Sequence, residues 1–242
     1  MKNLDKAEKF WNRTASFYDK VEKNDASYMI FIKMTEKYVK ENDNVLDFGC
    51  GTGLVCNEIA NIVKNIYAID ISSKMIVISK AKASERKIQN IEFAHTTIFD
   101  ERIKFGSFDA IIAFNIFHLL EESQKYIQRI NELLKPEGFI ISATPCMGEK
   151  PVLNSLLKIG SKIGIMPKIE SFKILEFEQL FINERFELTE TYRLKPNSPQ
   201  YLLIAKKLKW LFKIKYYMLK NDNRYFIDEE EFNQLGQELY KN

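Results

Sequence analysis

The sequence predicts an α/β fold in which a parallel sheet is covered by helices on both faces and completed by an antiparallel hairpin. The main reason is a steady alternation of short apolar segments with amphipathic ones over residues 44–143, which is typical of parallel strands joined by crossover helices. Two later strand-like segments separated by a turn predict the hairpin. The chain of 242 residues is long enough for one such domain with appendages.

Short apolar segments mark the strands. Those of the parallel sheet are predicted over residues 44–48, 65–70, 91–95, 108–114 and 138–143. Residues 186–194 and 200–205 are predicted to form the hairpin, because the turn-forming sequence Lys195-Pro196-Asn197-Ser198-Pro199 separates them.

Amphipathic segments between the strands predict helices. They cover residues 53–63, 73–86 and 121–134. The segment Lys135-Pro136-Glu137-Gly138 is predicted to end the third of them, since proline cannot continue a helix. Residues 144–185, with helices expected over 152–163 and 171–182, are interpreted as an insert on the substrate side.

Composition limits the partners, the metal sites and the cellular location that the sequence predicts. Hydrophobic residues make up 45% of the chain, and its net charge of +3 is too mild to require a nucleic-acid partner. The three cysteines, Cys50, Cys56 and Cys146, lack C-x-x-C spacing, and with only two histidines they predict no metal site. The odd thiol count and a polar chain start without an apolar signal core predict a cytoplasmic protein.

A glycine-rich sequence follows the first predicted strand and is the most informative part of the chain. It reads Val45-Leu46-Asp47-Phe48-Gly49-Cys50-Gly51-Thr52-Gly53. Glycines let backbone amides approach a ligand closely, and the helix that follows adds its positive end, so a nucleotide-like ligand is predicted. A dinucleotide fingerprint, G-x-G-x-x-G, would need glycine at Leu54, which disfavours a nicotinamide-dependent oxidoreductase.

This sequence resembles motif I of the class I S-adenosylmethionine-dependent methyltransferases, an acid followed by G-x-G-x-G. The matching residues are Asp47, Gly49, Gly51 and Gly53, with Cys50 inside the turn. The resemblance implies a Rossmann-like, doubly wound sheet of seven strands in the order 3-2-1-4-5-7-6, with S-adenosylmethionine as the methyl donor.

Asp70 ends the second predicted strand, seventeen positions after Gly53. A carboxylate there can accept hydrogen bonds from both ribose hydroxyls of an adenosyl group. Its alternative role is to complement the positive end of the helix that begins near Ser72. Ile71 and Met75 would flank the adenine, although packing alone explains them equally well.

In the resembled family, the loop after the third strand commonly carries an acid that reaches the adenine amino group. The matching positions here are Thr96 and Thr97, so the acid is missing. Either Thr97, through its hydroxyl or backbone, replaces that contact, or Asp100 takes the role.

The fourth predicted strand leads into Asn115 and His118, at the edge where a parallel sheet presents ligand sites. Asn115 is included among the donor contacts, and it lacks the Pro-Pro-aromatic continuation of enzymes that methylate nucleic-acid amines. His118 is the candidate catalytic base, because its ordinary pKa lies near neutrality. The alternative is that His118 only caps or packs at a helix start.

The segment from Phe10 to Asp19 resembles the W-x-x-x-A-x-x-Y-D sequence of the ubiquinone/menaquinone-type methyltransferases. There this region forms a lid over the donor, so residues 1–40 are interpreted as lid helices and Tyr18 as a donor contact. Phe10, Phe17 and Tyr18 are equally explained as core residues of an amphipathic helix.

The methyltransferase domain is predicted over residues 1–207 and a helical extension over 208–242. Residues 206–220 combine six lysines with apolar and aromatic side chains and contain no acid. We expect a helix packed on its own domain; peripheral contact with an anionic membrane is the less favoured alternative.

The predicted function is transfer of a methyl group to a small apolar or aromatic molecule. Apolar residues of the insert could line the substrate pocket, although core packing explains many of them. These are Met147, Leu153, Leu156, Leu157, Ile163, Ile165 and Met166. The alternatives are a catalytically silent donor-binding regulator and, less favoured, a nicotinamide-dependent oxidoreductase. The methyl acceptor and the oligomeric state are left open.

Overall fold

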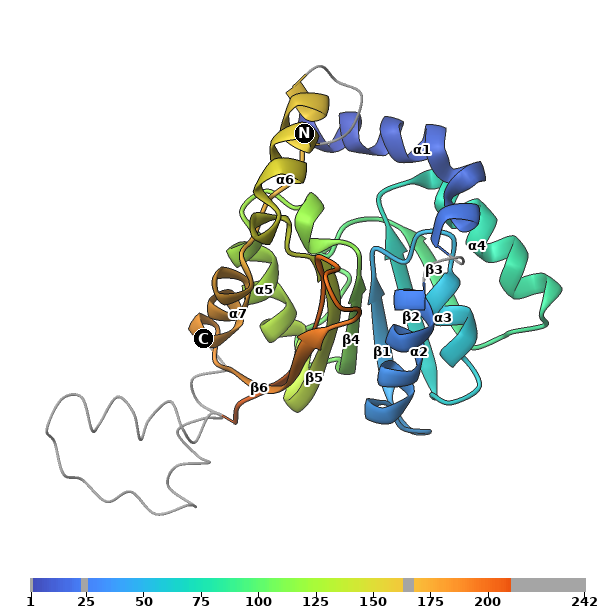
Figure 1. Cartoon of the computed structure of the whole chain (residues 1–242). Coiled ribbons are helices and arrows are strands. Elements are labelled where there is room, and N and C mark those ends of the chain that lie inside the picture. The colour runs from blue at the N-terminus through green and yellow to red at the C-terminus, as the bar shows by residue number, and fades with distance from the viewer. Residues whose placement is uncertain (1, 23–25, 163–167, 210–242) are drawn as a thin grey trace, which may run out of the picture. The chain divides into compact units, whose positions relative to one another are not determined.

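The computed structural model describes residues 2–22, 26–162 and 168–209, and Met1–Leu208 group into one compact unit. Its sheet has seven strands in the order β3-β2-β1-β4-β5-β7-β6, which confirms the predicted fold (Figure 1). The strands are β1 Asn44–Phe48, β2 Asn65–Asp70, β3 Ile91–His95, β4 Phe108–Phe114, β5 Leu134–Pro145, β6 Phe186–Arg193 and β7 Gln200–Lys207.

Helices and two short 3-10 helices connect the strands. They are α1 Lys2–Glu22, α2 Ala26–Tyr38, α3 Leu54–Ile59, α4 Ser73–Glu85, η1 Phe117–Leu119, α5 Ser123–Leu133, η2 Met147–Glu149, α6 Pro151–Lys162 and α7 Ile174–Asn183. None of the described helices is long and apolar enough to cross a membrane.

The first five strands run parallel, and β7 pairs antiparallel with both β5 and β6. Parallel strands end at the same edge, so the segments that follow β1, β2 and β4 meet there. This is the edge where the sequence places the donor and acceptor residues.

Alternate side chains of each central strand enter two separate buried clusters. Val45 and Ile112 pack in the cluster beneath α2, α3 and α4, whereas Leu46 and Ile111 pack in the cluster beneath α5 and α7. Figure 1 shows these two groups of helices on opposite sides of the sheet. The double coverage explains why the strand segments are almost continuously apolar.

The predicted helix stop is confirmed, because α5 ends at Leu133, but the segment Lys135-Pro136-Glu137-Gly138 lies within β5 and not in a turn before it. The pairing of β4 with β5 moves from Phe108–Leu134 to Ala110–Phe139, so the segment forms a bulge. Glu137 has a positive φ of 65° there. Helix α3 is also shorter than predicted and ends at Ile59.

The predicted end of the last strand is also corrected. Strand β7 continues through Lys207, whose Nζ donates to the carbonyl oxygens of Asn131 and Leu134 at 2.6 and 2.7 Å. The predicted helix over 206–220 is therefore wrong for its first four residues, because 206 and 207 belong to β7 and 208 and 209 to no helix. From residue 210 it lies outside the described residues.

The segment interpreted as a substrate-side insert contains a helix of the core. Phe177 and Phe181 of α7 are fully buried, and both rings contact Phe117 of η1. Of the residues proposed as pocket lining, Met147 is buried, Leu153 and Leu156 are exposed, and three others lie outside the described residues. Those three are Ile163, Ile165 and Met166.

Candidate functional site

The glycine turn at the end of β1 is tied to the end of β2. The backbone amides of Gly49 and Cys50 donate to the carbonyl oxygen of Ile69 at 2.9 and 3.0 Å. Gly49, Gly51 and Gly53 have φ values of 75°, 53° and 78°, which glycine adopts without strain. The turn therefore has the backbone geometry that the motif predicts.

The missing side chains of these glycines make room for neighbours. A Cβ at Gly49 would lie 2.9 Å from Cδ1 of Ile116, and one at Gly53 would lie 2.7 Å from Nδ2 of Asn57. A Cβ at Gly51 would touch the ring of Tyr18 at 3.4 Å. A side chain at Gly49 or Gly53 would therefore have to displace the side chain of Ile116 or Asn57 and would also be strained by the positive φ.

Asp70 joins the glycine turn to the start of α4. Its Oδ2 accepts from the backbone amide of Gly51 at 2.9 Å, and its Oδ1 accepts from that of Ser72 at 2.7 Å. Burial raises the pKa of Asp70, and these two hydrogen bonds oppose that shift. The carboxylate therefore performs the helix-start role given as its alternative, and it lies where the ribose contact was predicted.

Asp47 is buried beside the same turn. Burial raises its pKa to about 7, although a hydrogen bond from the Cys56 thiol opposes the shift. Its Oδ2 has no hydrogen-bond partner in the described part of the chain. A buried carboxylate oxygen without a partner is costly. The predicted role of Asp47 in donor binding stays a prediction.

The other predicted donor residues differ in exposure. The Cys50 thiol is buried, which raises its pKa well above the usual range and makes it unreactive. Met75 is fully buried in α4, as its packing alternative requires. Ile71 is half-buried, and its carbonyl oxygen lies 2.9 Å from Nε2 of His95.

The acid of the loop after β3, Asp100, is bonded to other residues of the same loop. Oδ2 of Asp100 accepts from Oγ1 of Thr96 at 2.7 Å, and Arg102 forms an ion pair with the same carboxylate. These hydrogen bonds hold the pKa of Asp100 well below its usual range. The carbonyl oxygen of Thr97 accepts a hydrogen bond from the backbone amide of Asp100. Asp100 is thus engaged by Arg102, which weakens the alternative that it contacts adenine.

Helix α1 is anchored to the glycine turn and to the start of α4. Asp19 accepts from the hydroxyl of Thr52 at 2.5 Å and pairs with Lys82. Oδ1 of Asn12 accepts from the backbone amide of Lys74 at 3.0 Å. Figure 1 shows α1 lying across this edge of the domain. The helix therefore lies against the glycine turn, with the ring of Tyr18 next to Gly51. Its role as a lid stays a prediction.

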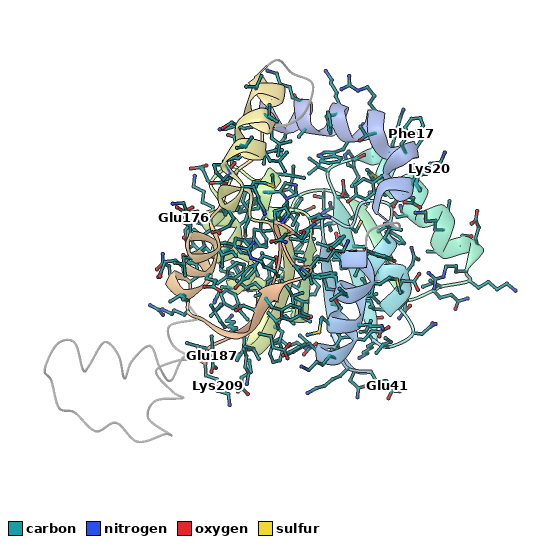
Figure 2. The ribbon with its side chains drawn as sticks, viewed as in Figure 1. Phe17, Lys20, Glu41, Glu176, Glu187 and Lys209 are labelled. Carbon is teal, nitrogen blue, oxygen red and sulfur yellow. The ribbon has the colours of Figure 1, made fainter. Side chains whose placement is uncertain are left out.

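The core interpretation of the α1 aromatics is wrong for Phe17. This side chain is 65% exposed and points away from the domain (Figure 2). Phe10 is half-buried and packs against Trp11, with ring centroids 5.1 Å apart. The helix therefore presents different aromatic residues to solvent and to the domain.

The segments after β4 and β5 and the start of β7 meet at a second part of the edge. Asn115 has a φ of 54° and accepts from Nε2 of Gln200 at 2.7 Å. The backbone amide and Nδ1 of His118 both lie 3.3 Å from Oγ1 of Thr144. Thr144 and Gln200 were not predicted, because neither belongs to a recognisable motif.

His118 lies in η1 in surroundings that disfavour its charged form. Burial lowers the pKa of its imidazole to about 4, so the ring is neutral at pH 7. A base with this pKa accepts protons weakly near neutral pH. The structure thus places His118 at the predicted edge but makes it a weaker base than its ordinary pKa suggested.

Comparison with known proteins identifies the family. Residues 39–209 match a family described as a methyltransferase domain. The chain belongs to this family. The finding confirms the predicted methyltransferase and counts against a nicotinamide-dependent oxidoreductase.

This methyltransferase is also similar to individual proteins over most of its length. Its sequence is 28% identical over 208 residues to an uncharacterized protein of Methanocaldococcus jannaschii, covering 76% of this chain and 77% of that one. It is 25% identical over 199 residues to a ubiquinone biosynthesis O-methyltransferase of Rickettsia bellii, covering 77% of this chain and 82% of the relative.

A solved structure shows the same fold. The 1,6-didemethyltoxoflavin-N1-methyltransferase of Burkholderia thailandensis superposes with a TM-score of 0.67 at 14% identity, covering 85% of this methyltransferase and 88% of that chain. That crystal structure contains 1,6-didemethyltoxoflavin and S-adenosylhomocysteine. The predicted cofactor agrees with this finding.

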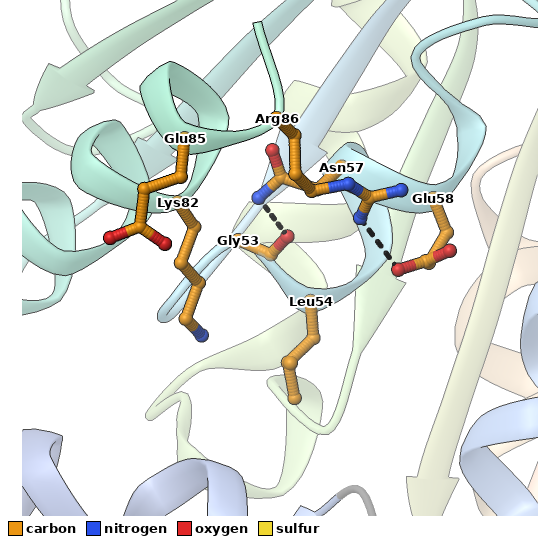
Figure 3. Close-up of a pocket in the computed structure, with 7 residues that line it drawn as sticks. All are labelled: Gly53, Leu54, Asn57, Glu58, Lys82, Glu85 and Arg86. Atoms are coloured by element: carbon orange, nitrogen blue, oxygen red, sulfur yellow. Dashed lines mark hydrogen bonds and ion pairs between the residues drawn. The ribbon is translucent and has the colours of Figure 1, made fainter. Parts of the chain in front are cut away.

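A cavity of about 290 Å³ lies between α3 and α4 (Figure 3). It is lined by Gly53, Leu54, Asn57, Glu58, Lys82, Glu85 and Arg86. Arg86 pairs with Glu58 at 2.7 Å, and Asn57 donates to the carbonyl oxygen of Gly53 at 2.6 Å. Of the predicted donor residues, the lining includes Gly53 alone, so this cavity differs from the predicted donor site.

Burial of His118 should make the stability of this methyltransferase fall at mildly acidic pH. The unfolded chain binds a proton at this histidine near its ordinary pKa of 6.5, whereas the folded chain binds it near 4. The stability associated with neutral His118 is therefore fully present above pH 6.5 and is lost as the pH falls toward 4. At pH 5 the loss is about 2 kcal/mol.

The check is urea unfolding of the wild type and His118→Gln at pH 7.5 and pH 5. We expect the variant to lose about 2 kcal/mol less unfolding free energy between the two pH values. All other groups are common to the two proteins and cancel in this difference. Equal losses in the two proteins would contradict the lowered pKa of His118.

Proposed function

We propose that this methyltransferase binds S-adenosylmethionine where β1 and β2 end and transfers its methyl group to a small apolar or aromatic molecule. The observation that carries the proposal is the glycine turn with its two acids. Three positive-φ glycines lie between the buried Asp47 and Asp70, whose carboxylate accepts from the turn itself. The family supports methyl transfer as the reaction.

The residues of this edge fit such a donor. The buried Oδ2 of Asp47 has no partner among the described residues, and a cationic ligand would compensate it. Asp70 would hold the ribose hydroxyls, because each of its oxygens accepts one backbone amide and retains a lone pair. When bound, S-adenosylmethionine supplies an electrophilic methyl group on a positively charged sulfur.

Several predicted contacts form part of the same proposal. Tyr18 would close over the glycine turn from α1, and Ile71 and Met75 would lie on the adenine side. Asn115 would lie between the methyl donor and the methyl acceptor, because it follows β4 directly and its backbone amide donates to the carbonyl oxygen of Ala143. Thr97 would contribute a neutral adenine contact in place of the family's acid.

The acceptor side is built from neutral groups. Asn115, Thr144 and Gln200 are uncharged, and burial keeps His118 neutral. This surface favours an uncharged molecule, and the bound 1,6-didemethyltoxoflavin of the similar structure provides an example of a small acceptor in this fold. The three cysteines are free and buried, as fits the reducing cytoplasm that we propose as the location.

We assign His118 to the transfer step as a neutral hydrogen-bond partner of the acceptor. His118→Gln should lower kcat and leave S-adenosylmethionine affinity within about twofold of the wild type, since its loss affects the transition state only. Steady-state kinetics and calorimetry measure the two quantities. Full turnover in this variant would leave His118 with a structural role.

The experiment that tests the proposed function supplies methyl-labelled S-adenosylmethionine together with a soluble cell extract. The extract is separated beforehand into small-molecule and macromolecular fractions. We expect label in an apolar or aromatic compound of the small-molecule fraction. Label confined to protein or nucleic acid would contradict the proposed substrate class. Donor binding without transfer to any fraction would contradict the activity.

A further inference from the structure

The side chain of Gln200 crosses the end of the sheet from β7 to Asn115. Gln200 begins β7 and is paired with Pro145, the last residue of β5. Its side chain extends past the end of β5 to Asn115, which follows β4, and Nε2 donates to Oδ1 of Asn115 at 2.7 Å. The amide of Gln200 therefore spans the carboxyl end of β5, next to the residues of the acceptor side.

The other end of this amide has no partner. The Oε1 atom of Gln200 is buried and accepts no hydrogen bond from any described residue. The bond to Asn115 favours this orientation, because turning the Gln200 amide alone would bring two carbonyl oxygens together. An unpaired buried carbonyl oxygen is unfavourable.

The surroundings define what could satisfy this oxygen. Thr144, whose pairing partner Tyr201 follows Gln200 in β7, already bonds to His118, and burial keeps the imidazole neutral. Oε1 is an acceptor, so its partner must be an N–H or O–H donor. A carboxylate or phosphate would place a second acceptor against it and would be rejected.

We propose that the methyl acceptor presents a neutral hydroxyl or N–H group to Oε1 of Gln200. This inference rests on the proposed function and narrows its substrate class to ring compounds that carry such a donor. Asn115 acts as a positioning residue, because it holds the Gln200 amide in the orientation that leaves Oε1 without a partner among the described residues. A site built to pair with a hydrogen-bond donor rejects analogues that lack it.

The test uses phenol, anisole and benzoate as probes, measured by ligand-observed NMR with the full chain saturated with S-adenosylhomocysteine. Phenol and anisole share the ring, but only phenol is a donor. We expect phenol to bind at least about tenfold more tightly than anisole, the effect of one hydrogen bond of about 1.4 kcal/mol. We expect benzoate to be excluded.

Gln200→Met provides the matched variant, since it preserves length and removes the amide. It should bind phenol and anisole equally while retaining its affinity for S-adenosylhomocysteine. Asn115→Ala should reduce the preference for phenol without removing it. If Gln200→Met does not fold, the wild-type comparison of phenol with anisole remains decisive.

Each other result counts against the inference. Equal binding of phenol and anisole by the wild type, or binding of neither up to their solubility, overturns it, as does a preference that survives in Gln200→Met. Failure of the wild type to bind S-adenosylhomocysteine would instead contradict the proposed function. The titration with S-adenosylhomocysteine therefore distinguishes failure of this inference from failure of the proposed function.

Discussion

Replacing Asp70 by alanine is expected to weaken S-adenosylhomocysteine binding by roughly ten- to more than a hundredfold. Charged hydrogen bonds of the kind proposed to the ribose each contribute about 1.5 to 3 kcal/mol, which converts to that range of affinity. The same change removes the acceptor of the Gly51 amide at 2.9 Å, so the turn also loses an anchor. Isothermal calorimetry measures the affinity.

Two further variants separate these contributions. Asp70→Asn retains one acceptor oxygen and should bind the ligand with intermediate affinity. Asp100→Asn removes an acid from the next loop that is bound to Arg102, and its affinity should match the wild type. Unchanged affinity in Asp70→Ala would contradict the assignment of the donor site.

Replacing Asp47 by asparagine should stabilise the protein at alkaline pH and weaken donor binding. Burial raises the pKa of Asp47 to about 7 in the folded chain, well above its ordinary value of 3.8. A raised carboxyl pKa contributes stability below the unfolded pKa, and that stability is lost as the pH rises through 7. At pH 8 the loss is about 4 kcal/mol.

Asparagine removes this pH-dependent cost because it remains uncharged. We expect the free energy of unfolding of Asp47→Asn to exceed that of the wild type by several kcal/mol at pH 8, with a much smaller difference at pH 4. Urea unfolding at both pH values measures it. Donor affinity should fall, since the negative charge proposed to face a cationic ligand is gone.

The control for this prediction is Asp109→Asn. Asp109 pairs with Lys135 at 2.7 Å and accepts from the Asn44 amide at 2.9 Å, so its removal should not stabilise the protein at pH 8. Asp47→Asn with the stability of the wild type at both pH values would show that the buried acid is not strained. A stability cost retained for function is common at ligand sites.

The strands were predictable because burial on both faces makes them short, continuous apolar runs. The bounds of β1 to β4 match the predicted segments. The start of β5 was missed, because Pro136 and Gly138 resemble a turn and their bulge depends on pairing with β4. Helix α7 was assigned to the substrate side, since apolar periodicity does not specify which surface a helix covers.

The clustering of the residues proposed for the donor side was predictable because they lie at the ends of consecutive strands. Asp47, Gly51 and Asp70 are near one another in the sequence pattern, and parallel strands bring them to one edge. Gln200 was missed because its partner Asn115 is 85 positions away and neither lies in a shared motif. The burial that lowers the pKa of His118 is likewise a tertiary property.

The most direct test of the donor assignment is a crystal structure of the protein with S-adenosylhomocysteine. Our account predicts the adenosyl group over the glycine turn, with the ribose hydroxyls within hydrogen-bond distance of the Asp70 carboxylate. The amino end of the ligand should face Asp47. A ligand bound instead in the cavity between α3 and α4, or absent from crystals grown at saturating concentration, would contradict the account.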